Sequence, residues 1–136
     1  EQLSKALKAE AATHETFSMS VGGLGAFPTL QRARVVWIGL DAPAALMALL
    51  RGVEAVAARL GYASESRPFS PHLTIGRIGQ NVSGTGFQRI QTALEGATIG
   101  TLGTLSVNAV HIFKSDLQPD GAVYKHLYTL PMKSKL

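Results

Sequence analysis

Three side chains close together in the sequence have the chemistry to act on a phosphate ester. The stretch RPFSPHLTIGRI, residues 67–78, contains His72, Thr74 and Arg77. An imidazole titrates near neutrality and can take or give a proton, and a threonine hydroxyl can donate a hydrogen bond to a phosphate oxygen. A guanidinium adds a planar fork of donors that suits phosphate. These residues are therefore the first candidates for a functional site.

The segment that carries them, residues 72–78, is predicted to be a strand. Side chains two apart on a strand point to the same face, so His72 and Thr74 should face outward together, while Leu73 and Ile75 point into the core. The alternative is an ordinary amphipathic strand with a solvated polar face, because the pattern His-x-Thr also occurs by chance.

Helices and strands alternate along the rest of the chain. We predict helices over residues 2–11, 43–60 and 86–96, and further strands over residues 17–21, 34–40, 105–115 and 124–132. The glycine-rich residues 22–28 are predicted to be a loop, Asp41 is expected to cap the second helix, and Gly61 to end it. The continuous apolar run at 34–40 suggests a strand buried on both faces. The pattern indicates one α+β domain over residues 1–136, with a largely antiparallel sheet backed by helices.

Composition excludes several classes of protein. The 136 residues are 46% hydrophobic and 16% charged, which excludes a disordered chain, and no apolar run approaches the length of a membrane span. Without cysteine there are no disulfides and no thiolate metal site, and a reducing compartment, the cytoplasm, is expected. No other metal-ligand motif is present. A net charge of +4 favours anionic partners such as phosphates or RNA.

The longer string RPFSPHLTIGR resembles the second signature of the two-histidine phosphoesterases, specifically the RNA 2',3'-cyclic phosphodiesterases, also called 2'-5' RNA ligases or LigT-like proteins. The segments VGGLGAFPTLQRARVVWIGLD and GAVYKHLYTLPM look like other strands of that family, so the similarity covers residues 17–132. It implies a fold of two lobes, each supplying one His-x-Thr motif, with no metal or other cofactor required. By this resemblance His72 and Thr74 are catalytic and Arg77 contacts the substrate phosphate.

The resemblance also implies a reaction. The substrate would be an RNA or nucleotide with a 2',3'-cyclic phosphate, opened to a 2'-phosphomonoester by two histidines that act as acid and base, with 2'-5' ligation as the reverse reaction. One alternative is a nucleotide- or RNA-binding module that keeps the second half-site without turnover. Another is a fragment whose sheet serves mainly for self-association.

A convincing first motif is missing. His14 begins the only other His-x-Thr, but HETF follows a helix and directly abuts a strand, so we do not interpret His14 as catalytic. We expect the family's first strands to be absent from this chain. Their absence would bare a sheet edge and favour a homodimer or a segment swap.

The remaining candidates are weaker. His111 and His126 are interpreted as partly exposed strand residues. Tyr124 and Tyr128 could stack on a base or contact a ligand, although ordinary strand packing is the alternative. Phe27, Trp37 and Phe69 are assigned mainly to packing.

Overall fold

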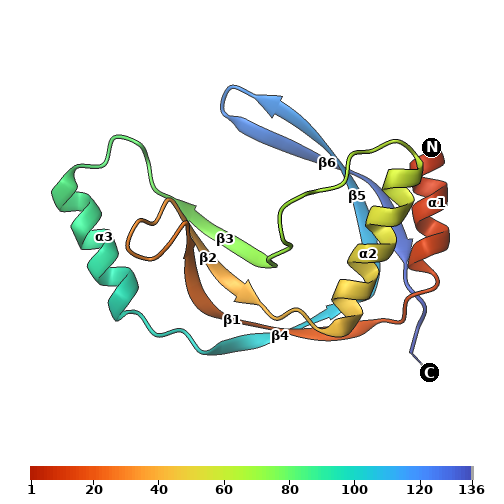
Figure 1. Ribbon diagram of the computed structural model, residues 1–136, viewed down its shortest axis with the longest axis horizontal. Coiled ribbons are helices and arrows are strands. Elements are labelled where there is room, and N and C mark those ends of the chain that lie inside the picture. The colour runs from red at the N-terminus through yellow and green to blue at the C-terminus, as the bar shows by residue number, and fades with distance from the viewer. Residues whose placement is uncertain (136) are drawn as a thin grey trace. The chain divides into compact units, whose positions relative to one another are not determined.

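The structure, a computed structural model, describes residues 1–135 and confirms the expected α+β class (Figure 1). Its elements in chain order are α1 (Gln2–Ala11), β1 (Phe17–Phe27), β2 (Val35–Leu40), α2 (Ala44–Arg59), β3 (His72–Arg77), α3 (Gly84–Gly96), β4 (Thr101–Val107), β5 (Ala109–Gln118) and β6 (Gly121–Pro131). The chain forms two compact units. The sheet unit contains residues 19–42 and 69–105, and the hairpin unit contains residues 1–18, 43–68 and the described residues from 106 on.

The sheet unit is built on four strands in the order β3-β2-β1-β4. Strand β2 pairs antiparallel with both β1 and β3, which places β3 at an edge of the sheet. Helix α3 begins after Ser83, whose hydroxyl accepts a hydrogen bond from the Gly86 amide at 3.0 Å. The predicted apolar stripe of α3, Phe87, Ile90 and Leu94, is half-buried.

The glycine-rich segment is part of a strand, so the prediction of a loop there was wrong. Strand β1 continues to Phe27, with a register shift between Val21 and Leu24. At Gly22 a Cβ atom would lie 2.5 Å from the carbonyl oxygen of Gly100, and Gly23 has a φ of +78°. Glycine is needed here because another stretch of backbone comes close and because the bulge takes up a left-handed conformation.

Two predictions around β2 also need correction. Asp41 does not cap α2: its carboxylate accepts a hydrogen bond from the Ser20 amide at 2.6 Å, and Pro43 occupies the N-cap position. Strand β2 is not buried on both faces, since Ile38 is its one buried residue. The end of α2 is as predicted, with Gly61 at a φ of +91° just beyond Leu60.

In the hairpin unit α1 packs against the antiparallel pair β5 and β6 and against α2 (Figure 1). Its core joins Leu7 and Ala11 of α1 with Val56 of α2 and Leu130 of β6, and the partly buried Val110 and Ile112 of β5 pack against this cluster. The predicted strand over residues 105–115 is in fact two strands. It is interrupted at Asn108, where β4 of the four-stranded sheet gives way to β5 of the hairpin.

The apolar side chains of β3 are not in the core, contrary to the prediction. Leu73 is 49% exposed and Ile75 is 61% exposed. Alternation along a strand fixes which residues share a face, but burial depends on whether another layer covers that face. None of the helices in residues 1–135 is long and apolar enough to cross a membrane.

Candidate functional site

His72 lies at the start of β3, with its ring beside aromatic rings from β1 and β2. The centroid of the imidazole lies 4.9 Å from that of Phe27, edge to face, and 6.1 Å from that of Trp37. The rings of Phe27 and Trp37 are themselves 5.3 Å apart. His72 is half-buried against these rings. Phe27 and Trp37 therefore pack as predicted, but what they pack against is the candidate histidine. The packing predicted for Phe69 was wrong, since this residue is 46% exposed.

A glycine makes room for Trp37. Gly25 of β1 pairs with Trp37 of β2, and a Cβ atom at Gly25 would fall on the atoms of the indole ring. Nε1 of Trp37 is buried without a hydrogen-bond partner among residues 1–135. The indole thus lies against the backbone of β1 at a position that only glycine leaves open, and this packing sets the surface on which His72 rests.

A backbone contact fixes the tautomer of His72. Its Nδ1 lies 2.7 Å from the carbonyl oxygen of Ser70, two residues earlier. Because a carbonyl can only accept, Nδ1 carries the hydrogen and donates it. In the neutral ring Nε2 then holds a lone pair, which is the form a general base needs.

A β-bulge brings Arg77 to the same face as His72 and Thr74. His72 pairs with Gly39 and Thr74 with Trp37, but Gly76 pairs with Val36 and Arg77 with Val35, so Ile75 is an extra residue in β3. Residues paired across antiparallel strands share a face, and alternate residues of β2 share a face. Simple alternation would have put Arg77, five residues after His72, on the opposite face. The bulge reverses this and aligns all three candidates.

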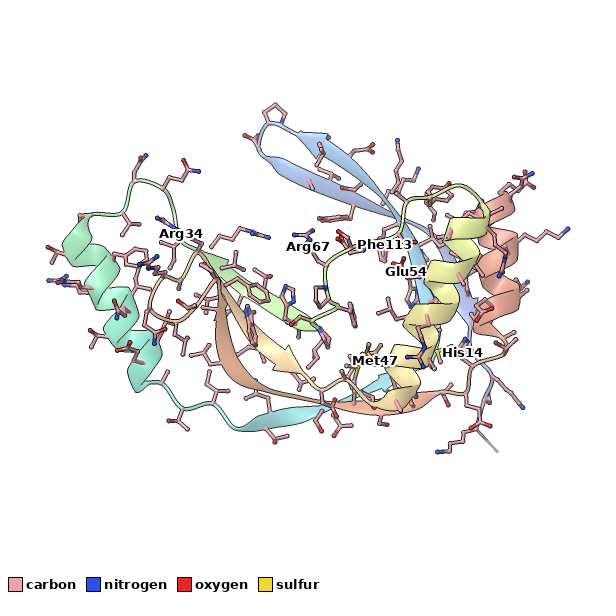
Figure 2. All side chains as sticks on the ribbon, viewed as in Figure 1. His14, Arg34, Met47, Glu54, Arg67 and Phe113 are labelled. Atoms are coloured by element: carbon pink, nitrogen blue, oxygen red, sulfur yellow. The ribbon has the colours of Figure 1, made fainter. Side chains whose placement is uncertain are left out.

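The polar groups on this face are open to solvent. Thr74 and Arg77 are exposed. Within residues 1–135, Arg77 takes part in none of the ion pairs. Arg34, labelled in Figure 2, lies instead over the ring of Phe87, 5.3 Å from its centroid. Arg77, the arginine that the sequence nominated, therefore has its guanidinium available for an anion on this face.

Arg67, the first residue of the candidate stretch, has a partner of its own in the hairpin unit. Its guanidinium donates to the carboxylate of Glu65, with Nε 3.3 Å from Oε1 (Figure 2). Hydrogen bonds from the Arg67 side chain and amide, together with the charge of Arg67, hold the pKa of Glu65 below its ordinary value. The hydrogen bond to Glu65 and its charge in turn raise the pKa of Arg67.

The sheet unit also has a hollow of about 410 Å³, which does not include the candidate residues. It is lined by Gly22 and other residues of β1, by the end of β2 with Asp41 just beyond it, and by the start of β4 with Gly100 just before it. Asp41 is the one titratable residue there, and its carboxylate is engaged by the Ser20 amide. We therefore place the candidate chemistry on the β3 face rather than in this hollow.

The other histidines all lie in the hairpin unit. His14 follows α1 and its Nε2 lies 2.8 Å from Oε1 of Glu10, a half-buried pair one helical turn apart (Figure 2). His111 of β5 and His126 of β6 are exposed and lie against each other, with Nδ1 of His111 3.3 Å from Nε2 of His126. The sequence does not reveal this contact, because His126 comes fifteen positions after His111.

The two candidate tyrosines do not form one surface. Tyr124 pairs with Ser115 and Tyr128 with Ile112, and a register shift between Ile112 and Phe113 lies between these pairs. Because of this shift, Tyr124 shares the face of His111, whereas Tyr128 lies on the face of Ile112. They are 68% and 43% exposed, so neither is a buried packing residue.

Comparison with known proteins agrees with the resemblance seen in the sequence. The profile of the 2'-5' RNA ligase superfamily matches residues 1–118. An RNA 2',3'-cyclic phosphodiesterase of Aeropyrum pernix is 30% identical over 88% of this chain and 67% of its own length. A protein of the same name from Methanothermobacter thermautotrophicus is 30% identical over 82% of this chain and 58% of its own length.

The fold matches as well. The structure of E. coli LigT complexed with 3'-AMP superposes with a TM-score of 0.63 at 26% identity, covering 96% of this chain and 68% of LigT. The match in profile, sequence and fold shows that the chain belongs to the 2'-5' RNA ligase superfamily. It spans about three fifths to two thirds of the length of these relatives.

Proposed function

We propose that this protein acts on RNA or nucleotides that end in a 2',3'-cyclic phosphate, and that His72, Thr74 and Arg77 form its phosphate-binding half-site. The observation that carries the proposal is the bulge in β3, which gives the imidazole of His72, the hydroxyl of Thr74 and the guanidinium of Arg77 one common face. The names of the relatives support the same chemistry, since they are called RNA 2',3'-cyclic phosphodiesterases.

In the proposed reaction, the oxygen of a water molecule bonds to phosphorus and the bond from phosphorus to O3' breaks. The phosphate stays on O2', so the product is a 2'-phosphomonoester. The water gives a proton to a base, and O3' receives one from an acid. The neutral tautomer of His72, with Nδ1 bonded to Ser70, suits the role of base through Nε2. Thr74 and Arg77 would hold the phosphate oxygens as negative charge builds up on them. If the 5'-hydroxyl of an RNA took the place of water, the same steps would join its oxygen to phosphorus and release O3', which is 2'-5' ligation.

The acid that completes the reaction belongs, by the family resemblance, to another His-x-Thr strand. His14 does not suit this role, because its Nε2 is held by the carboxylate of Glu10 at the end of a helix. This observation favours a second candidate function, a nucleotide- or RNA-binding module that keeps the half-site on β3 and does not turn over its ligand.

Turnover of a nucleoside 2',3'-cyclic phosphate, with the position of the product phosphate identified, tests the first proposal. His72→Ala should lower the rate by roughly 10²- to 10⁴-fold, the usual contribution of a general acid or base. His111→Ala, a matched change in the hairpin unit, should leave it unchanged. A chain that does not turn over but is stabilised against heat by the nucleotide would support the binding module. If His72→Ala binds the nucleotide as well as the parent does, both proposals fail.

We also propose that the chain associates with a second copy, or swaps a segment with it, through a sheet edge. Strand β3 is an edge strand with two exposed apolar side chains, Leu73 and Ile75, and unpaired edges of this kind favour pairing with another chain. Leu73→Lys should therefore weaken association in sedimentation experiments, whereas the same change at the solvent-exposed Ala58 of α2 should not. A parent chain that stays monomeric at high concentration would contradict this proposal.

A further inference from the structure

A second cluster of histidine and threonine side chains lies on the hairpin unit, away from its core. His111 pairs with Thr129 across β5 and β6, and the register shift at Leu127 brings His126 to the same face. Nδ1 of His111 lies 3.3 Å from Nε2 of His126 and 3.2 Å from Oγ1 of Thr129. The third side of the triangle, between Oγ1 of Thr129 and Nε2 of His126, is 3.0 Å.

Hydrogen bonds cannot satisfy all three contacts of this triangle at once. An imidazole nitrogen is either a donor or an acceptor, and a hydroxyl has a single hydrogen to give. At most two hydrogens can therefore point into the three short contacts, so that one of them has to be shared between two acceptors. The two ring nitrogens and the hydroxyl oxygen, all within 3.3 Å of one another, could instead share a cation through their lone pairs.

The spacing of the two nitrogens matches that of metal ligands. Zinc binds imidazole nitrogen at about 2.0–2.1 Å in a tetrahedral arrangement, which separates two ligand nitrogens by roughly 3.3–3.4 Å. The nitrogens of His111 and His126 are 3.3 Å apart. We propose that His111 and His126 form a binding site for a divalent transition metal ion, with the Thr129 hydroxyl as an adjacent oxygen donor.

The surroundings of the pair define what kind of site this is. No group of three or more His, Cys, Asp or Glu residues within residues 1–135 is arranged to hold a metal, so water would fill the remaining positions. Both histidines are exposed, which gives an ion and its water free access. The ring of Phe113 lies 5.2 Å from that of His126 and 6.4 Å from that of His111, forming an apolar wall beside the pair.

The hairpin also holds the pair in register. On its other face Val110, Ile112 and Leu130 pack with α1 and α2, so the register of β5 against β6 is fixed by a core. Two ligands already placed at the right separation lose little freedom when the ion binds. The site follows from the fold alone and does not depend on the phosphoesterase activity proposed above.

Calorimetric titration tests the proposal. The untagged 136-residue chain is titrated with CuSO4, NiCl2 and ZnCl2 in turn, and the heat of binding is measured. One ion should bind per chain, with Cu²⁺ tighter than Ni²⁺ or Zn²⁺, and binding should weaken as pH falls because only neutral imidazole is a ligand. His111→Gln and His126→Gln should each weaken Cu²⁺ binding by more than roughly 10- to 100-fold. That range is the usual cost of losing a residue that only supports a metal ligand through a hydrogen bond. His14→Gln and His72→Gln, the matched controls, should bind as the parent does.

The parent chain gives a second test that needs no variant. Paramagnetic Cu²⁺ at substoichiometric amounts should broaden the NMR ring signals of His111 and His126 before those of His14 and His72. Equal broadening of all four rings, no binding of any of the three ions, or binding that survives both glutamine substitutions would overturn the proposal.

Discussion

Gly25→Ala tests whether the indole of Trp37, which packs beside His72, lies directly against the backbone of β1 at Gly25. The new methyl group would fall on the indole of Trp37, which lies against the backbone of β1 at this point. Either the indole or the strand has to move, and overpacking of this kind costs about 1–3 kcal/mol. Because Trp37 packs against His72, the displacement should also disturb the candidate site.

The size of the effect can be read from urea unfolding followed by circular dichroism. With a slope of about 1–3 kcal/mol per M, a loss of that order lowers the midpoint by about 1 M. Trp37 is the only tryptophan of the chain, so its fluorescence reports on the same region separately. The stabilisation against heat that a bound nucleotide gives should also be smaller in Gly25→Ala than in the parent, if the position of His72 depends on the indole of Trp37.

Gly76→Ala is the matched control. Gly76 also lies in a strand, but a Cβ atom there would meet nothing within 4 Å, and its φ is not in the left-handed region. This change should be neutral or stabilise the chain by about 0.4–1 kcal/mol, because alanine restricts the unfolded state. Adding Trp37→Leu to Gly25→Ala should recover part of the lost stability, with a coupling of about 0.5–3 kcal/mol. A Gly25→Ala chain as stable as Gly76→Ala would refute the packing argument.

Three further predictions concern charge and capping. Arg77→Lys should keep the charge but weaken nucleotide binding, since an ammonium lacks the planar fork of donors; equal thermal protection of variant and parent would contradict this. Arg67→Ala should raise the pKa of Glu65 back toward its ordinary value, as an NMR titration would show. Because the pKa of Glu65 is depressed in the folded chain, the pair contributes stability above the unfolded pKa and loses it as pH falls through the folded pKa. Ser83→Ala should remove the hydrogen bond to the Gly86 amide and cost about 0.5–2 kcal/mol in urea unfolding, and an unchanged midpoint would show that the cap adds nothing.

Local sequence patterns predicted most of the elements. The helix over residues 2–11, the strand that begins at His72 and the stop at Gly61 all follow from apolar spacing and glycine, and the structure has them. The failures came where distant parts of the chain meet. By its sequence Gly22 is typical of a loop, but it lies in a strand because the backbone of Gly100 packs closely against it. By its sequence Asp41 is typical of a helix cap, but its carboxylate instead accepts a hydrogen bond from the Ser20 amide.

By itself, then, the sequence determined the family and nominated His72, Thr74 and Arg77, because residue types and short spacings are visible in one dimension. It could not decide which side chains share a face. Alternation along a strand holds only until an extra residue enters, and that depends on pairing with a neighbouring strand. The bulge at Ile75 puts Arg77 beside Thr74, and the bulge at Leu127 puts His126 beside His111. Both clusters exist because strand pairing, a tertiary property, sets the register.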